Sequence, residues 1–425
     1  MNTRELIETE ERTPERTTVV FEELESWIRN QVQGFIQRLL EEEVTELLGR
    51  RKSERREDGE GTSGYRNGYG KERKLTMSCG TIKLRRPRVS HLEQRFESRV
   101  LPLFANRTKE VGNLLPELYL HGLAQGDFEL ALRGLLGEEA PLSEATIARL
   151  KTKWQAEYEY WCNRRLDDLE VAYLWVDGIY VKAGLEKDKV CLLVALAALT
   201  DGRKVFIAIQ PGHRESTESW SEMVRHLKAR GLRAPRVVIG DGHLGIWAAL
   251  GNVWPEVDQQ RCWNHRLLNL LDKVSKKRQS QAKMMLKEIM YAPTLKQAVR
   301  LKGVFQAWCR KNGLDDAARL IDRDWDRMVT YYQYPKEHWV HLRTTNPVES
   351  PFSRVRLRTD ASRRYKKAEN ATALIWKTMM ISERHFRKLN KPELLPDVFS
   401  GIQYADGSRL KSVETESTKQ EEVAA

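Results

Sequence analysis

The sequence predicts an α/β core that is interrupted by an all-helical insertion and preceded by a mainly helical N-terminal region. Three observations lead to this prediction: apolar, strand-like runs between residues 171 and 262, helical periodicity across residues 264–342, and a helical pattern near the N-terminus. Short apolar runs between turn residues are typical of buried strands, and apolar residues at three- and four-residue steps are typical of helices.

Changes in composition along the chain predict its organisation. We expect a disordered segment over 1–18, an amphipathic helix over 19–50, a basic linker with a short β segment over 51–107, a helical, DNA-binding region over 108–165, the first part of the core over 166–263, the helical insertion over 264–342, the last part of the core over 343–400 and a disordered tail over 401–425. The two terminal segments are polar and poor in apolar residues, which is typical of disorder.

The charge balance indicates a polyanionic partner. Lys and Arg number 72 against 60 Asp and Glu in 425 residues, a formal net charge of +12. Such a surplus favours nucleic acid, although a merely basic protein is the alternative. The five cysteines are scattered without a CxxC pair, which is typical of a reducing compartment. With neither a signal peptide nor a run of about 20 apolar residues, we expect a cytoplasmic protein without a membrane partner.

The N-terminal helix and the linker after it each allow two interpretations. The helix carries apolar residues at helical spacing from Phe21 to Val44, which pack on another helix of the same chain or of a sister chain in a homodimer. In the linker, GYRNGYG contains Tyr65, Arg66 and Tyr69, which either stack on nucleic acid or stay solvated.

A helix-turn-helix-like pattern follows in the region over 108–165. We expect a helix from Asp127 to Leu136, a stop at Gly137 and a second helix that Ser143 caps. The second helix would offer Thr146, Arg149, Lys151 and Lys153 to DNA, but an ordinary helical hairpin with a basic face is the alternative.

The core begins with VAYLWVDGIYVKAG, residues 171–184, an apolar run that contains one carboxylate, Asp177. Burying an unpaired carboxylate is costly, so Asp177 should be paired, protonated or metal-bound, and we favour metal. Two further strands, 190–199 and 204–210, follow across short turns and predict an antiparallel meander. A helix over 216–230 then leads to a fourth buried strand over 236–240, and Asp241 stands at its carboxyl end.

This order of strands and helix is that of a ribonuclease H-like fold. Parallel strands of open sheets gather functional groups at their carboxyl ends, so Asp177 and Asp241 are the two acids most naturally brought together. An Asp-Gly turn is the alternative reading of Asp241 alone. The third acid is expected from a helix beyond the insertion, and Glu349 precedes a basic helical segment there.

The backbone setting of Glu349 is open at this stage. Asn346 as N-cap with Pro347 at the first helical position would place Glu349 at the third position, where a capping acid belongs. Alternatively, Ser350 is the cap and Pro351 opens the helix, because a proline further inside would remove a hydrogen bond.

Five motifs carry a resemblance to a known family: VDGIYVKAG, GHRESTESW, VIGDGHLGIWAAL, QQRCWNHRLLNLLDK and EHWVHLRTTNPVES. From about Tyr65 to about Leu389 the chain resembles the Mutator-type bacterial insertion-sequence transposases. The resemblance implies a DDE transposase whose catalytic and metal-binding acids are Asp177, Asp241 and Glu349. It also implies a Cys-x-x-His signature at Cys262 and His265, and a circular, copied-out intermediate. Pro351 and the segment DASRRYKKAEN after Thr359 depart from the family pattern.

We expect such a site to hold two Mg²⁺ ions, with Mn²⁺ as a substitute, and no small-molecule cofactor. Asp177 would bridge both ions, which stand about 4 Å apart in such sites. Water would attack at the transposon end, and the freed 3′-OH would then attack a second phosphodiester. Zinc is not favoured at Cys262 and His265, because a structural zinc site takes four ligands and no second pair stands at suitable spacing.

The expected partner is double-stranded DNA, both the terminal inverted repeats of the transposon and the target, and pairing two ends makes a homodimer the expected assembly. The residues assigned to DNA contact are Arg343, Asn346, Arg354, Arg356, Arg358, Arg363, Arg364 and Lys366 around Glu349, Arg149 and Lys153 in the N-terminal region, and His265. Two alternative functions are a DNA-binding regulator without catalysis and a structure-specific nuclease that cuts but does not join.

Overall fold

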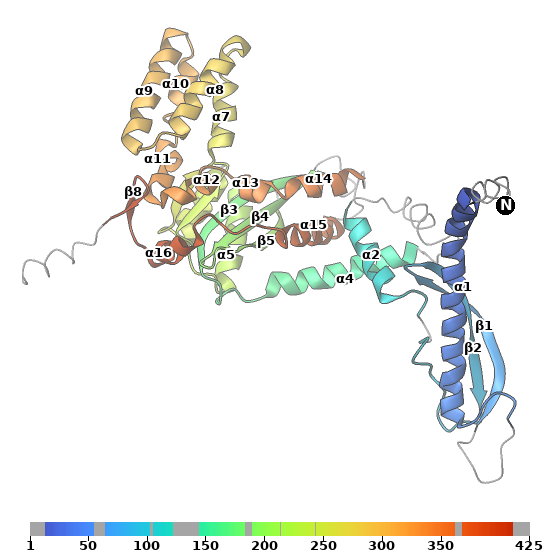
Figure 1. The fold of residues 1–425 in the computed structure, drawn as a ribbon. Coiled ribbons are helices and arrows are strands. Elements are labelled where there is room, and N and C mark those ends of the chain that lie inside the picture. Colours follow the sequence, from blue (N-terminus) through green and yellow to red (C-terminus); the bar gives the residue numbers. More distant parts are fainter. Residues whose placement is uncertain are drawn as a thin grey trace, which may run out of the picture. The chain divides into compact units, whose positions relative to one another are not determined.

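The structure is a computed structural model that describes residues 13–54, 64–102, 105–121, 144–182, 189–212, 214–242, 244–361 and 368–410 (Figure 1). The chain divides into two compact units, Met1–Leu150 and Lys151–Ala425. The predicted helix over 127–136 lies outside the described residues, and so does Ser143, the expected cap of the helix after it. Residues 1–12 and 411–425 also lie outside them.

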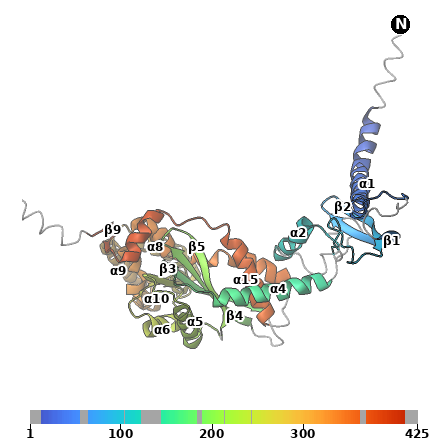
Figure 2. The same cartoon turned by 90° about the horizontal axis from the view of Figure 1, so that it is seen from below.

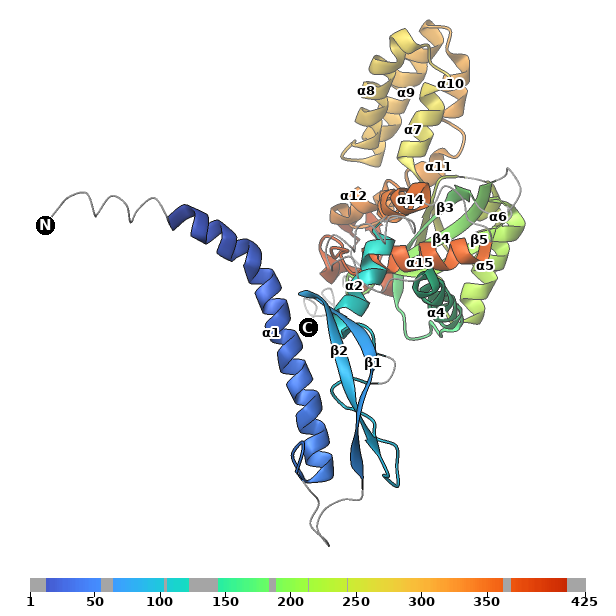
Figure 3. The same ribbon diagram turned by 90° about the vertical axis from the view of Figure 1, so that its right-hand side faces the viewer.

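The first unit is built on a long helix that packs against a β-hairpin. Helix α1 (Thr13–Leu48) lies along the hairpin of β1 (Tyr65–Met77) and β2 (Gly80–Ser90), as Figure 3 shows, and α2 (Lys109–Leu120) follows. The small core between helix and hairpin consists of Leu40, Leu75, Ile82, Leu84 and Leu101.

Two expectations for this unit are wrong. Residues 13–18 belong to α1, so the segment expected to be disordered over 1–18 is helical in that part. In the segment over 51–107, the part expected to be a linker is a strand from Tyr65 onward, and its register shifts twice between Arg66 and Glu72. Arg66 explains the order: its guanidinium donates to Thr45 Oγ1 at 2.7 Å and to the Glu41 carbonyl at 3.4 Å, so the strand is held on α1 by polar contacts.

The second unit contains a five-stranded mixed sheet in the order β5-β4-β3-β6-β7. Strands β3 (Val171–Lys182), β4 (Lys189–Leu199) and β5 (Lys204–Gly212) form the predicted antiparallel meander, and β6 (Val237–Gly240) and β7 (Asp258–Arg261) add on parallel to β3. The apolar runs that predicted the meander and β6 are therefore confirmed as strands.

The two faces of β3 pack against different parts of the chain. Leu174 and Val176 face a core formed with helices α5 (Thr217–Ala229) and α6 (Leu244–Val253), which includes Trp220 and Leu250. On the other face, Trp175 Nε1 donates to the His341 carbonyl at 2.9 Å. This alternation follows from the two-residue period of a strand and leaves the next position on that face, Asp177, near the segment that follows His341.

The regular elements between β7 and Glu349 are all helices, joined by short turns (Figure 1). They are α7 (Trp263–Leu271), α8 (Lys276–Met290), α9 (Leu295–Lys311), α10 (Asp315–Leu320), α11 (Trp325–Met328), the 3-10 helices η1 (Thr330–Gln333) and η2 (Lys336–His338), α12 (Trp339–Leu342) and α13 (Asn346–Glu349).

The C-terminal part returns to the sheet. Helix α14 (Phe352–Ala361) is followed by α15 (Ala368–Glu383), which contacts β5 and which Figure 2 draws beside α4 (Glu144–Asn163). Lys377 on α15 pairs with Glu157 on α4 at 2.5 Å. The last elements are η3 (Pro392–Leu394), α16 (Leu395–Ser400) and a two-stranded ladder of β8 (Tyr404–Ala405) and β9 (Ser408–Arg409). The tail expected to be disordered from 401 is thus ordered through β9. No helix in the described part of the chain has the length and apolar character needed to cross a membrane.

Candidate active site

Asp177 lies on β3 just beyond the point where the pairing of β3 with β6 ends. Strand β6 pairs with β3 only from Tyr173 to Trp175, so the β6-side edge of β3 is open from the next residues onward. The Asp177 carboxylate accepts a hydrogen bond from the Gly178 backbone N–H at 2.8 Å. Burial, with the charge of Glu349 as a further cause, raises the pKa of Asp177 to about 7. A buried acid of this kind gains from a nearby cation.

Asp241 follows the last residue of β6 and therefore stands at the same sheet edge. The Gly240 carbonyl accepts a hydrogen bond from Cys262 N at 2.8 Å, which fixes the strand end against the start of α7. Gly242 has φ +100°, and a Cβ at this position would clash with the Arg261 side chain. The Asp-Gly pair thus turns the chain at a point where only glycine fits.

Glu349 is the last residue of the four-residue helix α13, whose N-cap is Thr345. Neither Asn346 nor Ser350 is the N-cap, so both cap assignments are wrong. The first alternative was right that Glu349 lies inside a helix with Pro347 in its first turn, and Ser350 is the C-cap of that helix. Glu349 N donates to the Thr345 carbonyl at 3.1 Å, and the Thr345 hydroxyl also hydrogen-bonds to the Glu349 carboxylate. Pro351 lies between α13 and α14. A proline is tolerated there, because its missing N–H removes no hydrogen bond from the interior of either helix.

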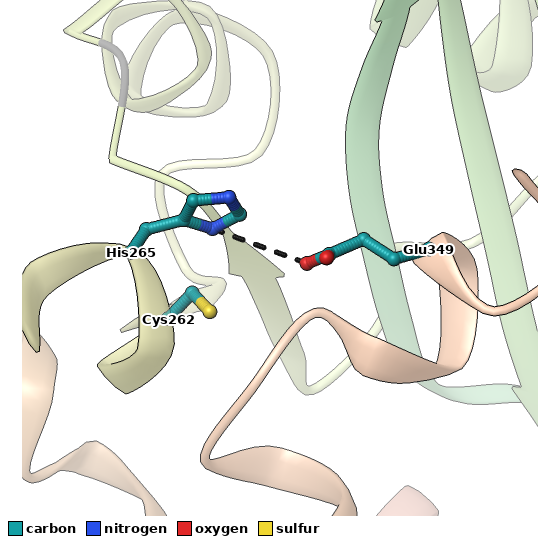
Figure 4. A group of neighbouring side chains, drawn as sticks. All are labelled: Cys262, His265 and Glu349. Carbon is teal, nitrogen blue, oxygen red and sulfur yellow. Dashed lines mark ion pairs between the residues drawn. The ribbon is translucent and has the colours of Figure 1, made fainter. Parts of the chain in front are cut away.

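His265 lies between two of the three acids. Its Nδ1 atom is 3.5 Å from Asp241 Oδ1 and 3.9 Å from Glu349 Oε1, and Figure 4 shows the imidazole and the Glu349 carboxylate pointing toward each other. The hydrogen bond with Cys262, together with the charges of Asp241 and Glu349, raises the pKa of His265 to about 9 despite its burial. The raised pKa favours the protonated imidazole, whose charge would complement both carboxylates.

Cys262 and Thr345 complete this cluster. The buried Cys262 sulfur accepts from Thr345 N at 3.3 Å, and the Thr345 hydroxyl lies 3.2 Å from the sulfur and 3.4 Å from His265 Nδ1. The ligand atoms of Cys262, His265 and Glu349 lie within 4.8 Å of one another. Three ligands do not complete a tetrahedral zinc site. Because a hydroxyl has one proton, Thr345 can donate to only one partner at a time.

Two further contacts tie α7 to the segment that carries Glu349. Asn264 Nδ2 donates to Asn346 Oδ1 at 3.0 Å, and Trp263 N donates to the Arg343 carbonyl at 2.9 Å. The start of α7 is thereby bonded both to the end of β6 and to residues 343–346. These bonds set the positions of Asp241 and Glu349 through one short stretch of chain.

The residues assigned to DNA contact fall into different environments. Arg343 and Arg358 are 9% and 2% exposed, and the Arg343 guanidinium lies over the rings of Tyr291, Tyr331 and Trp339 at 4.9 to 5.3 Å. Because both side chains are buried, we no longer expect Arg343 and Arg358 to contact DNA. Arg354 and Arg356, by contrast, lie exposed on α14.

The remaining assigned residues are only partly described. Asn346 is exposed and bonded to Asn264, Arg149 is exposed on α4, and Lys153 pairs with Glu157 at 3.7 Å. Arg363, Arg364 and Lys366 lie outside the described residues.

Sequence reasoning missed Thr345 and Glu215. Thr345 stands before an Asn-Pro pair, where a threonine is a natural helix cap, and that signal was available. Glu215 lies in GHRESTESW, just before the helix-capping Ser216, and nothing in the sequence places it beside Gly178, where the structure has it.

Comparison with known proteins identifies relatives along most of the chain. The profile described as "Transposase, Mutator family" matches residues 1–388. The chain is 40% identical over 301 residues to the transposase for insertion sequence element IS6120 of Mycolicibacterium smegmatis, covering 71% of this chain and 93% of that protein.

Two other relatives are also insertion-sequence transposases. The transposase for element IST2 of Acidithiobacillus ferrooxidans is 36% identical over 279 residues, covering 65% of this chain and 94% of that protein. The transposase for element ISRM5 of Rhizobium meliloti is 26% identical over 372 residues, covering 86% and 89%. From the profile match and these relatives, the chain belongs to the Mutator family of transposases.

Proposed function

We propose that this transposase cuts and joins DNA at the ends of an insertion sequence in a reaction that depends on Mg²⁺. The observation that supports the proposal is the position of His265 Nδ1, 3.5 Å from Asp241 and 3.9 Å from Glu349, together with the influence of the Glu349 charge on Asp177. Asp177 lies on β3, Asp241 follows β6, and Glu349 ends α13. For these acids to form one site, the helical segment between Asp241 and Glu349 must begin and end near the same edge of the sheet.

We infer that the core is ribonuclease H-like. Its support is the strand order β5-β4-β3-β6-β7, an antiparallel meander extended by two parallel strands on the side of β3. Ligands of open α/β sheets bind beyond the carboxyl ends of the parallel strands, and Asp241 lies at such an end.

The donor set suits Mg²⁺, which prefers carboxylate oxygens and keeps positions open for water and phosphate. Two such ions would activate the attacking oxygen and stabilise the leaving oxygen; Mn²⁺ is a substitute. Asp177 would be the ligand shared by both ions, and Asp241 and Glu349 would each bind one of them. The raised pKa of Asp177 is consistent with a carboxylate that loses its proton when cations bind.

The remaining residues of the cluster orient these acids. The Thr345 hydroxyl and the His265 imidazole hold the Glu349 carboxylate, and the imidazole also holds Asp241. Water is the nucleophile in the cleavage step, and the freed 3′-OH is the nucleophile in the joining step, so no covalent bond between protein and DNA is required.

We infer that double-stranded DNA, as terminal repeats and target, is the partner. A net charge of +12 supports this, and the exposed Arg354 and Arg356 lie on α14 just beyond Glu349. Guanidinium groups there would neutralise backbone phosphates near the acids. Arg149 and Lys153 on α4 and Asn346 remain proposed contacts.

Pairing two transposon ends favours a homodimer. Helix α1 exposes Leu24, Trp27, Ile28 and Phe35, of which Trp27 is 58% and Phe35 54% exposed. We propose this stripe as the surface that meets a second copy, since its apolar residues repeat at helical spacing.

The test uses the purified full chain, labelled DNA carrying the element's terminal repeat, and Mg²⁺ or Mn²⁺. We expect cleavage and strand joining by the natural chain. Asp177→Asn should lose both reactions and keep end binding, because it removes a metal ligand without changing shape.

Each alternative function has its own outcome in this assay. Binding without cleavage in every divalent cation would support a regulator, and cleavage without joining would support a nuclease. Activity of Asp177→Asn at the natural level would refute the assignment of Asp177.

A further inference from the structure

We propose that Glu215 is a fourth carboxylate of this site and helps to hold the divalent cations beside Asp177. This inference rests on the proposed function and adds a residue to its machinery. None of the three acids assigned above is replaced by it.

The strongest observation is the space above Gly178, the residue that follows Asp177. A Cβ built on Gly178 would lie 2.6 Å from Glu215 Oε1, 2.8 Å from its Cδ and 2.9 Å from its Cγ. Contacts under 3.0 Å do not occur for real Cβ atoms, so the glycine provides the space that the Glu215 side chain fills. An acid therefore lies directly on the backbone next to Asp177.

The backbone of Glu215 is held firmly in this place. Ser216 caps α5 by accepting from Ser219 N at 3.2 Å, and Gly245 on α6 approaches closely enough that its Cβ would be 2.8 Å from the Glu215 carbonyl oxygen. Gly178 on β3 and Gly245 on α6 both lack a side chain where Glu215 packs against them. Such close packing makes the position of the acid a consequence of the fold rather than of a loose loop.

The open edge of β3 lets acids from both faces of the sheet share one site. Successive strand positions face opposite sides, so Glu215, which packs on Gly178, and the Asp177 side chain start from different faces. Because β6 pairs with β3 only as far as Trp175, no strand covers the β6-side edge of β3 beyond that point, and side chains from both faces can extend toward this edge. The charge of Glu215 accordingly contributes, after burial and Glu349, to the raised pKa of Asp177.

The test measures Mn²⁺ binding by isothermal titration calorimetry with the full chain, which does not depend on turnover. Glu215→Gln should weaken Mn²⁺ binding about 10- to 100-fold, the range for residues that support a metal site. Glu218→Gln is the matched control, because Glu218 is an exposed acid three residues later, in the first turn of α5. It should bind as the natural chain does.

A second pair of variants tests position rather than charge. Gly178→Ala keeps every carboxylate but displaces the Glu215 side chain, so it should weaken Mn²⁺ to a similar extent. In a Glu215→Ala background the clash is gone, and adding Gly178→Ala should change the Mn²⁺ affinity less than twofold. If Gly178→Ala does not fold, the Glu215→Gln comparison still decides.

The outcomes separate this inference from the proposed function. If Asp177→Asn loses Mn²⁺ binding while Glu215→Gln matches Glu218→Gln, the role of Glu215 is refuted and the three-acid site stands. If Asp177→Asn binds Mn²⁺ like the natural chain, the proposed site itself fails. Selective weakening in Glu215→Gln and Gly178→Ala supports the fourth carboxylate.

Discussion

At the scale of single residues, the positions of the acids depend on the groups that hold them. His265 lies within 3.9 Å of both Asp241 and Glu349, and Thr345 bonds the Glu349 carboxylate, so these two acids have neighbours that position them before any cation binds. Asp177 is different, because its surroundings disfavour its charged form. Cation binding should therefore reorganise Asp177 more than the other two.

Replacing Thr345 tests the support of Glu349. Thr345→Val removes the hydroxyl but keeps the shape, so the Glu349 carboxylate loses a buried donor worth about 1–3 kcal/mol. We expect cleavage to fall about 10- to 100-fold while binding of the transposon end is unchanged. Thr345→Ser keeps the hydroxyl and should retain most activity; equal loss in both variants would contradict the role of the hydroxyl.

His341 gives a pH-dependent contribution to stability that is separate from the site. Burial lowers the pKa of His341 to about 4, below its ordinary 6.5, and Asn390 N donates to its Nε2 atom, which must be unprotonated to accept. The unfolded chain therefore binds a proton between pH 6.5 and 4 that the folded chain does not, and the free energy of unfolding falls as pH drops through this range.

In His341→Gln this contribution is absent, so its stability should decline less than that of the natural chain between pH 7 and 4.5. The measurement is the midpoint of urea unfolding across this range. His385→Gln, at an exposed position, is the control and should follow the natural chain. Parallel curves for His341→Gln and the natural chain would show that His341 is not the titrating group.

What the sequence could predict at this scale depends on how local the signal is. Asp177 is conspicuous because an acid inside an apolar run needs a partner. Arg343 looked like a DNA contact because it stands near Glu349, but Tyr291, Tyr331 and Trp339 surround it from distant positions in the chain. Aromatic contacts of this kind have no local signature.

At the scale of elements, apolar strands were predictable and the polar strand β1 was not. The meander strands carry their own apolar runs, whereas β1 begins with Tyr, Arg, Asn and Gly and is held on α1 through Arg66. Register shifts between Arg66 and Glu72 also break the two-residue alternation that identifies a strand. Pro351 indicated a break between α13 and α14, but the N-cap of α13 is Thr345, one residue before Asn346.

Arg66 is therefore expected to act on stability rather than on DNA. Arg66→Ala removes hydrogen bonds to Thr45 and to the Glu41 carbonyl and should destabilise the first unit by about 1–3 kcal/mol. Hydrogen exchange of the β1 and β2 amides reports this loss locally. Lys71→Ala, at an exposed position of the same strand, should have no effect on exchange. Weaker DNA binding with natural exchange in Arg66→Ala would favour a nucleic-acid contact instead.

At the scale of the whole molecule, the net charge of +12 predicts salt-dependent DNA binding. Each phosphate contact contributes about 0.9 to the slope of log affinity against log salt. Exchanging both Arg354 and Arg356 for Gln should lower that slope by about two, measured by fluorescence anisotropy on a labelled transposon end. Arg319→Gln, on the insertion and paired with Asp316, is the control. An unchanged slope in the double variant would remove α14 from the DNA surface.

The central claim is that residues 177, 241 and 349, far apart in the chain, surround one divalent-cation site. Fe²⁺ bound in place of Mg²⁺, with ascorbate and peroxide, generates hydroxyl radicals that cut the nearby backbone, and mass spectrometry maps the cuts. We predict cuts near all three positions in the natural chain, their suppression by excess Mg²⁺, and their loss in Asp177→Asn. Cuts confined to one of the three positions, or equal cutting in Asp177→Asn, would contradict the shared site.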